Sequence, residues 1–73
     1  NSGLLYRYAS KEIIKNNPKS PISFLKNKFN KVSYSSICKQ KLHSEEISNH
    51  VAFLAKKKEI RKIINEFQKK VIK

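Results

Sequence analysis

The apolar residues of this chain recur every three or four positions, and this spacing is what most limits the folds open to it. Residues three and four apart share one face of an α-helix. Such a stripe follows Pro21, at Ile22, Leu25, Phe29 and Val32. Ser20 can cap this segment, and Pro21 suits a first helical position, where its missing N–H costs nothing. The pattern predicts a helix over residues 20–32.

A helix is also expected before this segment. Leu5, Ala9 and Ile13 stand four residues apart and predict a helix over residues 3–17. The helix should end before Pro18, because a residue that precedes proline avoids the helical region of backbone space.

The second half of the chain contains no glycine or proline, which permits one long helix over residues 35–71. A shorter helix that restarts at Ser44-Glu45-Glu46 is the alternative, since acidic residues favour a helix N-terminus. The expected fold is a single all-α domain over residues 1–73, a three-helix antiparallel bundle with an extended third helix. Its interior positions should be Leu5, Ala9, Ile13, Leu25, Phe29, Val32, Val51 and Leu54.

A second apolar stripe in the long segment is displaced around the helix from the stripe through Val51 and Leu54. Its members are Ile60, Ile64, Phe67 and Val71. At about 1.5 Å per residue the third helix would reach about 50 Å, against about 20 Å for the others. We therefore expect this stripe to project beyond the bundle and to dock on a client, which is either another protein subunit or ribosomal RNA and protein. The alternative is that the helix bends and packs the stripe against its own bundle.

The chain is strongly basic, with 17 Lys and Arg against five acidic residues and a net charge of +12. Its natural partner is an anion: nucleic acid, an acidic protein or a charged membrane surface. A hydrophobic content of 38% argues against a disordered basic tail. Tyr6, Tyr8 and Tyr34 lie among basic residues and could stack on bases. A basic RNA-binding structural protein of an organellar ribosome is therefore one functional reading.

Neither a catalytic centre nor a metal site is expected. Cys38, His43 and His50 are five and seven residues apart, which is not a zinc-finger spacing. A Cys-His nucleophile pair would need a third orienting group. The chain's one glycine, Gly3, offers no phosphate-binding loop. No apolar run approaches the roughly 20 residues that span a bilayer.

A tripeptide, Leu5-Tyr6-Arg7, stands at the start of the first expected helix, and Lys11 follows four residues later. The second expected helix carries Phe-Leu-x-x-x-Phe from Phe24 to Phe29. With a longer third helix, this order resembles the LYR-motif family of small mitochondrial proteins. Three segments are most similar to the family's assembly-factor branch associated with mitochondrial ATP synthase: Phe29-Asn30-Lys31-Val32, Ile37-Cys38-Lys39, and His50 to Phe67.

The resemblance implies a protein of the mitochondrial matrix that binds mitochondrial acyl carrier protein. The carrier's acyl-4′-phosphopantetheine would insert its acyl chain among the helices and be lined by the interior positions above. The acidic carrier would be met by Arg7, Lys11, Lys26 and Lys31. Without a cofactor of its own, the protein would be a non-enzymatic adaptor, an assembly factor or chaperone that docks the carrier on a respiratory complex, ATP synthase or the mitoribosome. An acyl chain would also fill the core of so short a chain, at about 0.8 kcal/mol per buried methylene.

Overall fold

The computed structural model describes residues 2–71, and this part of the chain is helical without a strand. Five helices follow one another: α1 (Ser2–Asn16), α2 (Pro21–Lys31), α3 (Tyr34–Cys38), α4 (Glu45–Ala55) and α5 (Lys58–Val71). The all-α prediction is confirmed. The predicted domain also took in residues 1, 72 and 73, which lie outside the described range.

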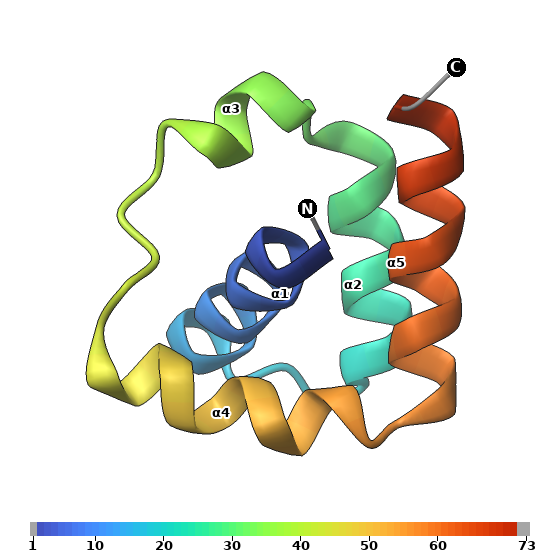
Figure 1. Ribbon diagram of the computed structural model, residues 1–73. Helices are drawn as coiled ribbons and strands as arrows, with labels where there is room; N and C mark the ends of the chain where they lie inside the picture. Colours follow the sequence, from blue (N-terminus) through green and yellow to red (C-terminus); the bar gives the residue numbers. More distant parts are fainter. Residues whose placement is uncertain (1, 72–73) are drawn as a thin grey trace.

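The helices surround α1 (Figure 1). The view shows α2 and α5 side by side, α4 lying across one end of this pair and α3 at the other end. Both α2 and α5 run from the α4 end of the molecule towards the α3 end. The chain therefore does not form three long antiparallel helices, because α4 carries it back across the molecule before α5 begins.

The single third helix predicted over residues 35–71 is wrong, and the restart at Ser44 is correct. Residues 39–44 form no helix between α3 and α4, and a second break falls at Lys56 and Lys57. Serine side chains begin the new helices: Ser33 Oγ accepts the N–H of Ser36, and Ser44 Oγ accepts that of Ile47, both at 3.1 Å. These bonds satisfy backbone donors that a helix start leaves unpaired.

The second apolar stripe does not project from the bundle. Ile60 and Ile64 are 0% exposed and Phe67 is 6% exposed, whereas Val71 is 40% exposed. The expectation of an exposed stripe is therefore wrong for its first three members, and the folded-back alternative describes them. A straight helix could not turn both Leu54 and this displaced stripe towards one core, and the break after α4 allows it.

The core is joined by a line of three aromatic rings from three helices. The ring of Tyr8 on α1 meets that of Phe29 on α2 edge-on, with centroids 5.4 Å apart. Phe29 in turn lies 5.0 Å from Phe67 on α5. Such tilted pairs stabilise a core beyond the apolar area they bury.

The predicted interior positions lie in or against this core. The buried ones are Leu5, Ala9, Leu25, Phe29 and Leu54, and the half-buried ones are Ile13, Val32 and Val51. The prediction of inward-facing positions is confirmed for the first group, and the second group packs at the core's margin. Tyr8, Ile37, Leu42 and Ile63 are further core residues that were not predicted.

Replacing Ile64 with alanine should lower the free energy of unfolding by about 2–5 kcal/mol, because the side chain is fully buried. Val71→Ala, at the exposed end of the same stripe, is the matched control and should change it by less than about 1 kcal/mol. Urea unfolding followed by circular dichroism measures both variants. Equal small losses would contradict the placement of Ile64 in the core.

Tyr8 should make the protein sensitive to alkali. Burial disfavours the phenolate, and the charge of Glu12 adds to this effect, so the pKa of Tyr8 rises from 10.0 to about 12. The folded state holds the proton more tightly than the unfolded state does. The resulting stabilisation is complete below pH 10 and is lost as the pH rises towards 12.

The variant Tyr8→Phe removes this titration, so its stability should fall less steeply above pH 10 than that of the natural protein. Lysine titration is common to both proteins and cancels in the comparison. The measurement is the urea midpoint as a function of pH. Parallel alkaline declines would rule out a contribution from Tyr8.

Candidate binding groove

A groove with a volume of about 420 Å³ runs between α2 and α5. This volume falls in the range of small-ligand sites. Its apolar lining residues are Ile22, Phe29, Ile63 and Phe67, and its polar lining residues are Lys26, Asn30, Glu59, Lys62, Glu66 and Lys70. We call these the groove floor and the groove rim.

Helical spacing brings these residues to facing sides of the two helices. Ile22, Lys26 and Phe29 follow one face of α2 at steps of four and three. On α5, Ile63 and Phe67 are four residues apart, as are Lys62 and Glu66. The helices α2 and α5 lie side by side (Figure 1), and both rows of residues line the groove.

The groove suits a ligand that is apolar in part and carries a negative charge. Its three lysines outnumber its two glutamates. Lys70 Nζ donates a hydrogen bond to Asn30 Oδ1 at 3.5 Å, across the two helices. Lys26 and Lys62 form no ion pair with any described residue. Because neither lysine has an ion-pair partner to give up, each is available to pair with a negatively charged group of a ligand.

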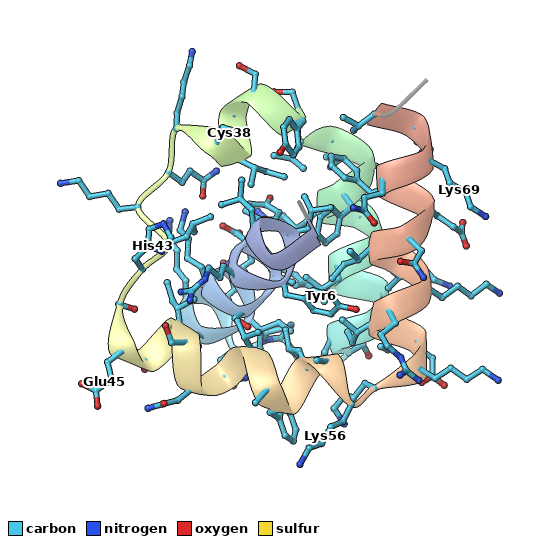
Figure 2. All side chains as sticks on the ribbon, viewed as in Figure 1. Tyr6, Cys38, His43, Glu45, Lys56 and Lys69 are labelled. Atoms are coloured by element: carbon cyan, nitrogen blue, oxygen red, sulfur yellow. The ribbon has the colours of Figure 1, made fainter. Side chains whose placement is uncertain are left out.

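The arginine of the Leu5-Tyr6-Arg7 tripeptide is held inside the molecule. Its Nη1 donates to the carbonyl oxygen of Leu42 at 3.0 Å and to Ser48 Oγ at 2.9 Å. These bonds tie α1 to the segment before α4 and to α4 itself. Leu5 is buried, and Tyr6 is half-buried against the core. Figure 2 shows Tyr6 over the centre of the molecule, whereas Lys56 and Lys69 point outwards.

Lys11 is also held by internal partners. Its Nζ lies 2.5 Å from Gln40 Oε1 and 3.6 Å from Glu12 Oε2. Glu12 is 7% exposed, and Lys28 approaches its other oxygen at 3.3 Å. A buried carboxylate needs such cations, since burial without a partner is costly. Glu12 thus links α1 to α2, a role that the sequence pattern did not indicate.

The four lysine and arginine side chains predicted to meet a carrier are therefore not in one place. Arg7 and Lys11 are tied to the segment before α4, while Lys26 and Lys31 are exposed on α2. Of these, Lys26 alone lines the groove. The α5 residues Lys62 and Lys70 were expected to flank the second apolar stripe and were not predicted to meet a carrier. Their eight-residue separation around Glu66 places all three on one helix face.

The cysteine and histidines weighed as metal ligands lie in successive elements. Cys38 and His43 are exposed, and His50 is half-buried. Within residues 2–71 no group of three or more His, Cys, Asp or Glu side chains is placed to hold a metal ion. Tyr34 lies one turn before Cys38, and the hydrogen bond between the two side chains raises the pKa of Tyr34 above its usual 10.0.

Comparison of the chain with protein-family models, with curated proteins and with solved structures finds no match. The resemblance to the LYR-motif family therefore stays a hypothesis that depends on the residues quoted for it. Among the described helices, none combines the length and apolar character needed to cross a membrane.

The two hydrogen bonds that Arg7 donates to Leu42 and Ser48 can be tested with the protein alone. Arg7→Ala should lower the free energy of unfolding by about 1.5–3 kcal/mol, because it removes two hydrogen bonds from a charged donor. Lys15→Ala, at an exposed position of α1, is the control and should have little effect. Thermal or urea unfolding measures both. An unchanged stability for Arg7→Ala would show that Arg7 is free in solution and available to a partner.

Proposed function

We propose that the protein is a non-enzymatic adaptor of the LYR-motif kind, which holds an acylated acyl carrier protein in the mitochondrial matrix. The observation that supports this best is the groove between α2 and α5, with an apolar floor beside unpaired lysines. An acyl chain needs such a floor, and the acidic surface of a carrier suits the lysines. The protein needs no cofactor of its own for this role, since the carrier brings the acyl-4′-phosphopantetheine.

In this proposal the acyl chain lies along the groove rather than among the helices around α1. Four of the eight interior positions expected to line it are closed by packing: Leu5, Ala9, Leu25 and Leu54 are at most 2% exposed. Phe29 belongs to both the expected lining and the groove floor. A chain entering the groove would cover Phe29, Ile63 and Phe67 without opening the core. Each buried methylene contributes about 0.8 kcal/mol to such binding.

The net charge of +12 would steer an acidic carrier towards the protein before the groove is reached. Lys26 on α2 and Lys62 on α5 are placed to meet it at the groove rim. Lys31, the other exposed residue of the predicted carrier contact, lies at the end of α2 and would extend this surface. Arg7 and Lys11 act instead by holding α1 in place.

The proposed delivery of the carrier to a larger complex needs a surface other than the one expected from the sequence. Ile60 and Ile64 are fully buried in the core, and Phe67 lies in the groove floor. The larger assembly, whether a respiratory complex, ATP synthase or the mitoribosome, would contact the outer faces of the helices.

The net charge of the chain also supports the alternative function, an RNA-binding ribosomal protein. This alternative loses one stacking candidate, because the ring of Tyr8 is 4% exposed.

The double charge reversal Lys26→Glu with Lys62→Glu should weaken binding of acylated carrier by about tenfold or more. Lys15→Glu with Lys19→Glu changes the net charge equally at exposed positions outside the groove and is the matched control. Titration calorimetry with purified carrier measures both pairs. Equal weakening would show that overall charge alone attracts the carrier.

The groove also predicts a preference for acylated carrier. Binding should strengthen by about 0.8 kcal/mol for each methylene that enters the groove. Ile63→Gln should abolish most of this preference, because it places an amide in the groove floor. The same titration with acylated and unacylated carrier measures it. Equal affinity for the two carrier forms would contradict a role for the groove in holding the acyl chain.

A further inference from the structure

A second surface lies at the corner where α4 turns into α5, away from the groove floor. We define this α4–α5 corner by Phe53, Lys56, Lys57 and Lys58. The side chain of Phe53 is 55% exposed, more than that of Val71, the other large apolar residue exposed in the described chain. Phe29 and Phe67 are buried in the core, whereas Phe53 is not. Core packing therefore does not explain why an aromatic ring stands at this position.

The exposed ring lies among cations. Lys57 Nζ lies 4.6 Å from the centre of the Phe53 ring, in cation–π contact. Lys56, Lys57 and Lys58 are all exposed, and none forms an ion pair within residues 2–71. The nearest acidic residue in sequence, Glu59, lines the groove. Three adjacent cations therefore stand beside an apolar ring without a neutralising partner.

The Phe53 ring packs against a second ring of the same helix, α4. The ring of His50, one turn earlier, lies 5.6 Å from it. His50 Nδ1 is buried and has no hydrogen-bond partner in the described structure. The Phe53 ring therefore packs partly against His50 and is otherwise exposed at the end of α4.

The corner projects outwards. Figure 2 shows Lys56 at the outer edge of the molecule, where α4 ends, with its side chain directed away from the helices. An exposed ring with lysines on a projecting turn is not shaped to enclose a ligand. It is suited to contact a broad surface that has an anionic outer layer over an apolar interior.

We propose that the α4–α5 corner binds the surface of an anionic lipid bilayer. The ring of Phe53 enters the boundary between headgroups and acyl chains, and Lys56, Lys57 and Lys58 contact lipid phosphates. The chain lies on the membrane without crossing it. The proposed function does not require this surface, and none of the four corner residues lines the groove.

Single-stranded nucleic acid is the less suitable anion for this corner. Proteins that bind it present successive rings on which bases stack. Here Phe53 is the only large exposed aromatic residue in the described chain. Tyr6 and Tyr34 are half-buried, and Tyr8 is buried. One ring beside a cluster of lysines supplies both signals that binding to an anionic lipid interface needs, whereas one ring does not make a stacking platform.

The first experiment uses the absence of tryptophan from the chain. Phe53→Trp creates a single fluorescent reporter at an exposed position. Its emission should shift to shorter wavelength when vesicles of phosphatidylcholine with phosphatidylglycerol are added, and should not shift with phosphatidylcholine alone. An unchanged emission with the anionic vesicles would overturn the proposal. So would a shift caused by single-stranded RNA in the absence of any shift with vesicles.

The second experiment measures vesicle binding by co-sedimentation. The triple variant Lys56→Gln, Lys57→Gln, Lys58→Gln should bind the anionic vesicles about 100-fold more weakly, at about fivefold for each lysine near the surface. The control, Lys15→Gln with Lys19→Gln and Lys39→Gln, lowers the net charge equally at other exposed positions and should lose far less. Equal losses in the two triples would assign the attraction to overall charge and overturn the proposal.

Phe53→Ala separates the ring from the lysines, because it leaves the net charge unchanged. It should weaken binding to the anionic vesicles by about tenfold. Circular dichroism should show the natural helix content, since the removed ring is mainly exposed. Binding as tight as that of the natural protein would show that the ring does not enter the bilayer, and would overturn the proposal.

Discussion

The contact of Phe29 with both Tyr8 and Phe67 is the interaction on which the rest of the structure depends. It joins α1 and α2, which are neighbours in the chain, to α5, which begins only at Lys58. No described helix exceeds 15 residues, and helices of that length are marginal in water by themselves. They persist because they pack against one another. The groove floor includes Phe29 and Phe67, so the candidate site exists only when this contact is made.

The first two helices and most of the core could be predicted from the sequence, whereas the path of the second half could not. Helices expected over residues 3–17 and 20–32 are Ser2–Asn16 and Pro21–Lys31. Their apolar stripes and prolines are local signals. The break at 39–44 contains neither glycine nor proline. It is set instead by the burial of Leu42 and the bond of its carbonyl to Arg7, a contact over 35 residues.

The candidate site was predictable only in part for the same reason. Lys26 could be proposed from the charge on the second helix, but Lys62 and Lys70 become its neighbours only because α5 runs beside α2. The tripeptide led to Arg7 being predicted as a carrier contact, whereas its side chain bonds to Leu42 and Ser48 within the molecule. Its direction depends on where Leu42 and Ser48 lie, and no local pattern specifies that.

The burial of Ile60, Ile64 and Phe67 on a helix that packs against α1 and α2 also bears on when the fold is completed during synthesis. A chain emerging from a ribosome cannot complete this core until α5 has left the ribosome. Before that moment, Leu5, Leu25 and Phe29 lack the partners that shield them, and the segment is a substrate for chaperones and proteases. Emergence of α5 is therefore the step at which the side chains of Leu5, Leu25 and Phe29 become shielded.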